Sequence, residues 1–266
     1  MARGRTYSQL VRKYEGGESR RVPDKLVVEE PLEIRLDGNR ITTTMRTPGN
    51  DYELAVGFCH TDGLLAGAPV QTVRYCATGS AVDTAFNIVT VETGGVAPVP
   101  TARLTTTTSS CGWCGTDEID AVTDRLAPVA GHVAIDPEVL AAMPERVRAG
   151  QELFDETGGV HAAAAFTAEG EVLLVREDIG RHNAVDKVVG RMLLDGRLPA
   201  AGLGLYVSGR TSFELVQKAW AGGFSAIVAV SAPSSLAAQA ATRAGITLAG
   251  FARPGRLNIY VDPSVD

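Results

Sequence analysis

The sequence has few cysteines, four in 266 residues, and it lacks any apolar run of the roughly 20 residues that a membrane-spanning helix needs. Four cysteines in a chain of this length do not make the disulfide framework of a small secreted domain, and the sequence has no apolar signal-peptide segment. An excess of positive charge is also absent: the formal net charge of −6 disfavours a general nucleic-acid or anionic-membrane surface. We therefore expect a soluble cytoplasmic protein with reduced thiols.

Hydrophobic residues make up 45% of the chain, which is enough for the core of one large domain or two small ones. Composition divides the chain into four parts. Residues 1–24 are polar and hold a cluster of arginines and lysines, which favours a flexible tail over a basic binding surface. We expect an α+β domain at 25–100, a mobile Thr-rich linker loop at 101–116 and an α/β domain at 117–266.

Two patterns predict the structure of the N-terminal domain. Apolar residues alternate with polar ones on both sides of an Asp-Gly-Asn turn, which indicates a hairpin over residues 31–46. Asn50 or Asp51 then caps a helix whose apolar face includes Cys59, so we interpret Cys59 as a core residue rather than a metal ligand. Further strands are expected at residues 70–76 and 85–91.

In the C-terminal domain, predicted strands and helices alternate. Asp136-Pro137 is a helix start, and Pro144 is expected to divide residues 137–156 into two helices. The apolar segments 203–207, 226–230 and 247–251 read as strands buried on both faces, with helices at 212–221 and 234–244 between them. This alternation predicts a parallel sheet covered by helices.

Two of the four cysteines lie in the segment Cys111-Gly112-Trp113-Cys114-Gly115, after a run of threonine and serine. Glycine and hydroxyl residues favour an accessible loop, and the CxxC spacing lowers the pKa of a thiol. The pair fits a dithiol/disulfide couple, half of a zinc site, or a nucleophile that carries sulfur as a persulfide. The residues alone leave these three chemistries open.

Residues 177–187 form the densest ionisable cluster. His182 is a candidate general acid or base, with Asp178 orienting it, although the same residues also suit the capping of a helix end. His161 resembles the histidine of zinc deaminases, which use His-x-Glu and a later Pro-Cys-x-x-Cys. Ala163 stands at the glutamate position and no cysteine follows Cys114, so we predict no zinc-deaminase site, and His161 is either a pocket residue or a core histidine.

Three turns that follow predicted strands carry groups suited to binding phosphate. Residues 208–212 offer hydroxyls, among them Ser208, and the Arg210 guanidinium, and Ser231 opens a second hydroxyl-rich turn. The third turn adds two guanidiniums and an aromatic ring that can stack on a base; its residues are Phe251, Ala252, Arg253, Pro254, Gly255 and Arg256. Three such turns at successive strand ends indicate a nucleotide-like anionic ligand.

Six segments in order resemble the FdhD family, the formate dehydrogenase accessory sulfurtransferases. They are C-G-W-C-G (111–115), G-G-V-H-A-A-A (158–164), E-D-I-G-R-H-N-A-V-D-K (177–187), S-G-R-T-S-F-E-L-V-Q-K (208–218), S-A-P-S-S-L-A (231–237) and F-A-R-P-G-R (251–256). Each segment alone is modest evidence for the family. The ordered set spans almost the whole chain beyond the first 24 residues and is highly specific to the family.

The resemblance implies that the C-terminal domain has a cytidine-deaminase-like three-layer α/β fold without zinc. It also implies a sulfur carrier that takes persulfide sulfur from a cysteine desulfurase on Cys111, with Cys114 as its companion. The sulfur would go to the molybdenum cofactor, in its bis-guanine-dinucleotide form, before this cofactor enters formate dehydrogenase. The cofactor's GDP-like part maps onto residues 251–256, and the resemblance favours a homodimer.

Other classes of function remain as alternatives. One is a non-enzymatic chaperone that binds the molybdenum cofactor and uses the cysteines only to dock partners. Another is a thioredoxin-like dithiol oxidoreductase, which is disfavoured because the cysteine pair lies on a long linker rather than at a strand-to-helix start. A structural zinc site that includes both cysteines is the third.

Overall fold

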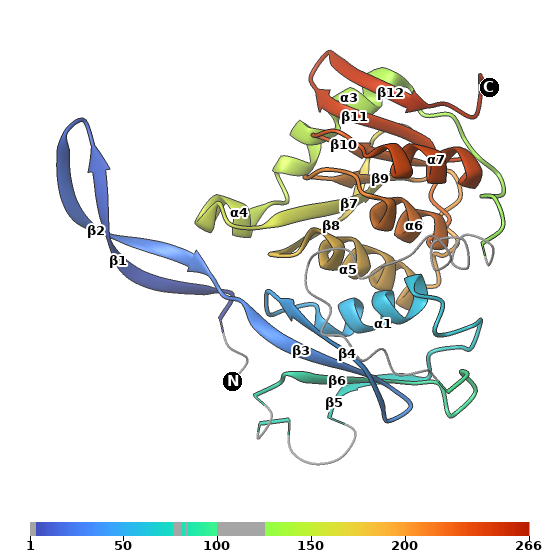
Figure 1. The fold of residues 1–266 in the computed structure, drawn as a ribbon, viewed down its shortest axis with the longest axis horizontal. Helices are drawn as coiled ribbons and strands as arrows, with labels where there is room; N and C mark the ends of the chain where they lie inside the picture. The colour runs from blue at the N-terminus through green and yellow to red at the C-terminus, as the bar shows by residue number, and fades with distance from the viewer. Residues whose placement is uncertain (1–3, 77–80, 83–84, 100–125, 266) are drawn as a thin grey trace.

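The computed structural model describes residues 4–76, 81–82, 85–99 and 126–265. Within these residues the strands form three sheets, of two, four and six strands (Figure 1). The sheet of six belongs to the C-terminal part of the chain and the sheet of four to the N-terminal part. The sheet of two is a hairpin that projects from the rest of the molecule. The boundaries of the predicted domains stay a prediction.

The six-stranded sheet has the order β12-β11-β10-β9-β7-β8. Its strands are β7 (His161–Phe166), β8 (Val172–Asp178), β9 (Gly204–Val207), β10 (Ala226–Ala229), β11 (Thr247–Arg253) and β12 (Arg256–Val261). The central strands β9, β10 and β11 are parallel, as the apolar segments predict. The flanking strands β7 and β12 are antiparallel to their neighbours, so the sheet is mixed rather than purely parallel.

Helices cover both faces of this sheet. The helices are α3 (Pro137–Arg148) and the short α4 (Glu152–Thr157) before β7, and α5 (Arg181–Leu194), α6 (Phe213–Ala221) and α7 (Ser235–Ala244) after β8. Because side chains alternate along a strand, Ala163 and Ala165 pack in the cluster with α5, α6 and α7, while Ala164 and Phe166 pack in the cluster with α3. The prediction of a three-layer α/β architecture is confirmed.

Two helices follow Asp136, as predicted, but Pro144 does not divide them. Helix α3 continues through Pro144 to Arg148, and the second helix begins only at Glu152. Leu140, Met143 and Val147 on the same helix are buried in the sheet-facing cluster. The burial of this apolar face outweighs the one backbone hydrogen bond that a proline removes.

The four-stranded sheet has the order β4-β3-β6-β5, with α1 (Asp51–Thr61) packed on it. Its strands are β3 (Glu30–Leu36), β4 (Asn39–Arg46), β5 (Thr72–Tyr75) and β6 (Ile88–Glu92). The predicted hairpin and the helix start after Asn50 are confirmed. Cys59 is fully buried, and burial raises the pKa of its thiol far above the usual range, which confirms it as a core residue.

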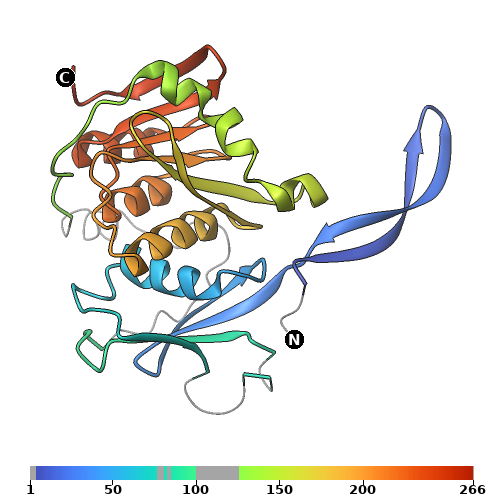
Figure 2. The same cartoon turned by 180° about the vertical axis from the view of Figure 1, so that it is seen from behind.

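Helices α1 and α5 join the two parts of the molecule through a close backbone contact. A Cβ atom on Gly57 would lie 1.9 Å from the carbonyl oxygen of Asp186, and one on Gly190 would lie 1.9 Å from that of Glu53. Only glycine fits at either position, because any side chain would overlap backbone atoms. Figure 2 shows α1 lying between α5 and the four-stranded sheet.

Residues 6–27 form a hairpin where the sequence composition predicts a flexible tail. Strands β1 (Thr6–Glu15) and β2 (Glu18–Val27) pair antiparallel from Thr6↔Val27 to Glu15↔Glu18. Gly16 and Gly17 both have positive φ, of 62° and 90°, which is the two-residue turn that suits the twist of a hairpin. The Glu-Gly-Gly-Glu sequence was therefore a hairpin signal that the high charge of the segment obscured.

Candidate functional site

One edge of the six-stranded sheet gathers the turns that the sequence singles out. The parallel strands β9, β10 and β11 end there, and β7 begins there because it runs antiparallel to β9. The edge therefore brings His161 together with the turns that begin at Ser208 and Ser231 and with Arg253 at the end of β11. Carboxyl ends of strands in open α/β sheets are the usual ligand-binding edge.

Hydrogen bonds tie the three turns into one rim. The amide of Thr211 donates to Ala232 O at 3.2 Å, and the amide of Ser234 donates to Thr211 O at 3.0 Å. The amide of Phe251 donates to Ser231 O at 3.3 Å. The three turns therefore form one continuous surface, and each turn is held in place by hydrogen bonds to its neighbour.

The third turn is the β-hairpin corner between β11 and β12. Arg253 and Arg256 are directly paired, and Gly255 has a φ of 74°, which favours glycine in the turn between them. A hollow of about 390 Å³ opens here and is lined by both arginines and by Phe251, Leu257 and Asn258. Phe251 is 46% exposed at a φ of 53°, an uncommon conformation for a non-glycine residue.

Not every residue of the predicted cofactor segment faces this hollow. Ala252 is fully buried in the cluster between α3 and the sheet. Its side chain is therefore part of the core, and only its backbone lies at the turn. Pro254 and Gly255 are exposed and form the corner itself, and Arg210 is exposed on the neighbouring turn.

A second hollow, of about 580 Å³, lies at the same edge. His161, Ser208, Ile179 and Arg253 line it from the strand ends. His161 Nδ1 lies 3.3 Å from Ser208 Oγ, which also accepts a hydrogen bond of 2.8 Å from the Ala162 amide. Since Arg253 lines both hollows, the two are neighbours, and His161 is a pocket residue rather than a core histidine.

The far wall of this hollow consists of residues that the sequence analysis missed. They include Arg148 and Phe154, with the Arg148 guanidinium 4.8 Å from the centre of the Phe154 ring, and Tyr206 on β9. Burial raises the pKa of Tyr206 to about 12, while the charges of Arg253 and Arg148 oppose that shift. A polar hydroxyl in an otherwise apolar strand was the one sequence feature that pointed to Tyr206. The positions of Arg148 and Phe154 depend on the direction of α3, which the sequence does not reveal.

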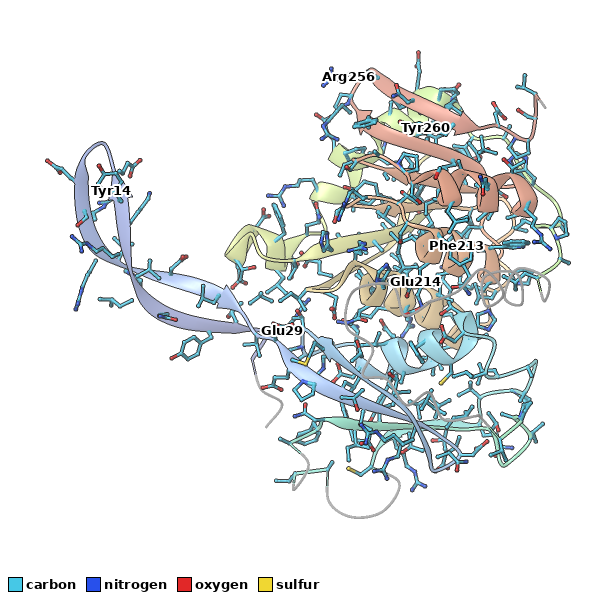
Figure 3. The ribbon with its side chains drawn as sticks, in the orientation of Figure 1. Tyr14, Glu29, Phe213, Glu214, Arg256 and Tyr260 are labelled. Carbon is cyan, nitrogen blue, oxygen red and sulfur yellow. The ribbon has the colours of Figure 1, made fainter. Side chains whose placement is uncertain are left out.

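His182 is nearly buried at the start of α5. Its Nε2 lies 3.4 Å from Ser212 Oγ and 3.5 Å from a carboxylate oxygen of Glu214, which Figure 3 labels on α6. Burial, followed by the charges of Arg181 and Lys218, lowers the pKa of His182 to about 3. The imidazole is therefore uncharged at neutral pH, and it acts as a hydrogen-bonding group rather than as a cation.

Asp178 does not orient His182, which corrects the interpretation made from sequence. Its carboxylate instead pairs with Lys187 at 2.8 Å, with both side chains fully buried, and accepts hydrogen bonds from the Thr47 amide and Asn183 Nδ2. These contacts join α5 to the turn between β4 and α1. Most of the 177–187 cluster thus holds the two parts of the molecule together.

The low pKa of His182 predicts a measurable dependence of stability on pH. Because the folded-state pKa lies below the unfolded value of about 6.5, stability is complete above that pH and falls as the pH drops toward 3. At pH 4.5, about two pH units below the unfolded pKa, the loss from this residue is about 3 kcal/mol. Urea unfolding of the native chain and of His182→Gln at pH 7 and pH 4.5 should show a smaller loss in the variant; equal losses would contradict the assignment.

The predicted sulfur-binding residues Cys111 and Cys114 lie outside the described residues. On either side of their segment, Pro98 and Leu126 line one largely apolar hollow of about 800 Å³ together with His60 and Leu193. His60 and Leu193 are in the last turns of α1 and α5, whereas His182 is in the first turn of α5. The described flanks of the CxxC segment are thus at the opposite end of α5 from the strand-end hollows.

No helix in the described part of the chain is both long and apolar enough to cross a bilayer. The same residues contain no group of three or more histidine, cysteine, aspartate or glutamate side chains placed to hold a metal ion.

Comparisons with known proteins agree on one family. Residues 27–265 match the model of the FdhD/NarQ family. A Streptomyces avermitilis protein named sulfur carrier protein FdhD is 50% identical over 265 residues, covering 95% of this chain and 92% of that protein. A Mycobacterium tuberculosis protein of the same name is 47% identical over 251 residues and covers 90% of each chain.

A solved structure supports the same overall architecture. A formate dehydrogenase accessory protein from Desulfotalea psychrophila superposes with a TM-score of 0.78, covering 98% of this chain and 99% of that chain. The two sequences are 23% identical, so this likeness shows the fold alone.

Proposed function

Since the chain belongs to the FdhD/NarQ family, we propose that it carries sulfur from a cysteine desulfurase to a molybdenum cofactor that serves formate dehydrogenase. Cys111 receives the sulfur as a persulfide, and the cofactor, in its bis-guanine-dinucleotide form, binds at the strand-end edge. The observation that carries the proposal is the position of Arg253, which lines both hollows at the edge where three hydrogen-bonded turns meet.

The chemistry of this edge suits a large anionic nucleotide. Arg253 and Arg256 present guanidiniums for phosphate, and the exposed ring of Phe251 offers a stacking face for a base. Ser208 and Ser231 place hydroxyl-bearing turns on the neighbouring strand ends. Two adjoining hollows of about 390 and 580 Å³ offer separate space for a nucleotide and for the part of the ligand beyond its phosphates.

Sulfur transfer to the carrier is a thiol exchange. The Cys111 thiolate attacks the outer sulfur of the desulfurase persulfide, the S–S bond of that persulfide breaks, and the desulfurase cysteine leaves as a thiolate. Attack of the Cys114 thiolate on the inner sulfur of Cys111 then releases hydrosulfide and forms a Cys111–Cys114 disulfide. A cellular dithiol reduces this disulfide for the next cycle.

His182 contributes as a neutral group in this scheme. Its low pKa means that it carries one ring proton and no positive charge at neutral pH, and it hydrogen-bonds Ser212 at the start of α6. We assign it the task of keeping this side of the rim in place, rather than the transfer of a proton that it stores.

A cofactor-binding chaperone without sulfur chemistry is the second candidate. It is favoured by one observation, namely that described residues able to bind an anion, Arg253 among them, line both hollows. The double variant Cys111→Ala/Cys114→Ala separates the two candidates. A chaperone would still support maturation of formate dehydrogenase with this variant, whereas a sulfur carrier would not.

Binding of GDP tests the assignment of the strand-end edge. The variant Arg253→Ala/Arg256→Ala should bind GDP at least tenfold more weakly than the native chain, because a charge-assisted hydrogen bond contributes about 1.5–3 kcal/mol. Isothermal titration calorimetry measures this directly. Arg197→Ala, an exposed arginine away from the three turns, is the matched control and should leave the affinity unchanged. Equal affinity of the double variant and the native chain would refute the site.

A further inference from the structure

Two nearly buried polar side chains in the larger strand-end hollow, that of about 580 Å³, have no hydrogen-bond partner among the described residues. Gln151 is 6% exposed and Tyr206 is 3% exposed, and both line the hollow. Gln151 stands directly before α4, but its side chain does not cap that helix. Buried polar groups are almost always hydrogen-bonded, so an unpaired amide and an unpaired hydroxyl in one hollow point to a ligand that pairs with both.

Backbone hydrogen bonds hold the segment that carries Gln151. The Gln151 amide N–H donates to Arg148 O at 3.2 Å. On the other side, the buried Glu177 carboxylate accepts hydrogen bonds of 2.8 Å from the amides of Leu153 and Phe154. Because the backbone is fixed both before and after Gln151, little conformational entropy is lost when its side chain binds a ligand.

The surroundings of these two groups are positively charged and partly aromatic. Burial raises the pKa of the Tyr206 hydroxyl, and the charges of Arg253 and Arg148 oppose that rise, so both guanidiniums lie near the hydroxyl. The Arg148 guanidinium lies 4.8 Å from the centre of the Phe154 ring, and Phe154 is 37% exposed. A planar guanidinium and an aromatic ring are surfaces on which a heterocycle can stack. The hollow therefore suits a flat, amide-bearing ring attached to a negative group.

The position of Arg253 indicates which ring this is, in an argument that rests on the proposed binding of the cofactor. In that ligand a diphosphate joins each guanosine to a pterin, a bicyclic ring whose edge carries a 4-oxo group, an N3–H and a 2-amino group. Arg253 lines both strand-end hollows and so suits the diphosphate between the two rings. Phe251 offers a stacking face for guanine in the smaller hollow, which leaves the larger one to the pterin.

We propose that Gln151 and Tyr206 recognise the pterin and determine the selectivity of the larger hollow for it. The Gln151 amide oxygen accepts from the ring N3–H, and the amide nitrogen donates to the 4-oxo group. The Tyr206 hydroxyl accepts from the 2-amino group next to them. A ring that lacks this edge leaves the buried amide and hydroxyl unpaired, which lowers its affinity.

Binding of a fluorescent pterin to the full chain tests the proposal. The probe is 6-hydroxymethylpterin phosphate, and fluorescence anisotropy measures its affinity. Gln151→Leu and Tyr206→Phe each remove a polar group at nearly constant size, and each should weaken binding of the probe at least about fivefold. Their affinity for GDP, measured by calorimetry, should fall less, so the ratio of pterin to GDP affinity should change.

A second probe separates recognition from a structural role of Tyr206. The corresponding lumazine phosphate has an oxo group in place of the 2-amino group, so it cannot donate to the Tyr206 hydroxyl. The native chain should bind the lumazine more weakly than the pterin, and Tyr206→Phe should bind the two nearly equally. An unchanged preference for the pterin in Tyr206→Phe would contradict the role of the hydroxyl.

The controls make the same two substitutions on the exposed β1–β2 hairpin. Gln9→Leu and Tyr14→Phe should leave the affinity for the probe unchanged, and thermal unfolding midpoints report whether each variant is folded. A native chain that binds GDP but not the pterin would overturn this inference alone, whereas one that binds neither would also overturn the cofactor binding on which it rests. Variants that lose as much GDP affinity as pterin affinity would assign the hollow to guanine instead, and variants that lose neither would refute the roles of Gln151 and Tyr206.

Discussion

Cys111→Ala is expected to reduce the maturation of formate dehydrogenase at least a hundredfold and to leave the carrier folded. The thiolate is the only group at this position that can attack a persulfide and hold its sulfur, and alanine offers no substitute. Formate dehydrogenase activity in cells whose own copy has been deleted and replaced by the variant measures the effect. Circular dichroism of the purified variant reports its fold.

Cys59→Ala is the matched control for this experiment. Cys59 is fully buried in α1, and burial keeps its thiol protonated by raising its pKa. Its removal should cost about 1 kcal/mol of stability, through a small cavity, without loss of maturation. If Cys59→Ala abolished maturation and Cys111→Ala did not, the assignment of the sulfur-bearing thiol would be wrong.

Lys218→Met is expected to produce the largest loss of stability among the substitutions considered. Lys218 Nζ lies 2.9 Å from both carboxylate oxygens of Asp186 and 3.0 Å from Thr61 Oγ1, so it joins α6, α5 and α1. The lysine is 1% exposed. Methionine would fill the space but leave Asp186 as a buried charge without its cation, which costs about 3–5 kcal/mol. Urea unfolding at pH 8 measures the loss.

The loss should shrink at low pH. Burial raises the pKa of Asp186 to about 6 even though the Lys218 ammonium opposes that shift, and removal of the ammonium raises the pKa further. A folded-state pKa above the unfolded value means that the folded variant gains stability when Asp186 is protonated and loses it as the pH rises through this raised pKa, above 6. Urea unfolding at pH 5 should therefore show a smaller deficit than at pH 8.

Arg191→Met provides the matched control for a broken ion pair. Arg191 pairs with Asp195 on the exposed side of α5 at 2.7 Å, and an exposed pair of this kind contributes less than about 1 kcal/mol. A deficit for Lys218→Met as small as that of Arg191→Met would show that the buried pair does not hold the three helices together.

The fold was largely predictable because its signals are local. Alternating apolar residues predicted the hairpin of β3 and β4, and continuous apolar runs predicted the doubly buried strands β9, β10 and β11. The prediction that Pro144 divides the helix was wrong, because the burial of Leu140 and Met143 on the same helix is a tertiary effect that the local sequence does not show. The β1–β2 hairpin was missed because its charge obscured the Gly16-Gly17 turn.

The candidate site was predictable only where it follows strand ends. Ser208, Ser231 and Arg253 could be placed at one edge because the order of strands and helices fixes which turns meet there. Arg148 and Phe154 could not be placed at this edge from the sequence, because the direction in which α3 and α4 cross the sheet depends on tertiary packing. Asp178 was wrongly paired with His182, since nothing local reveals that Thr47 and Lys187 compete for its carboxylate.

The central claim, that Cys111 carries sulfur, is tested most directly by intact-protein mass spectrometry after incubation with a cysteine desulfurase and cysteine. The account predicts a gain of about 32 Da for each sulfur, as expected for the persulfide formed by thiol exchange. The gain should disappear on treatment with a reductant and should be absent in Cys111→Ala. A native chain that gains no mass while its thiols are free and the desulfurase is active would contradict the account and favour the cofactor-binding chaperone.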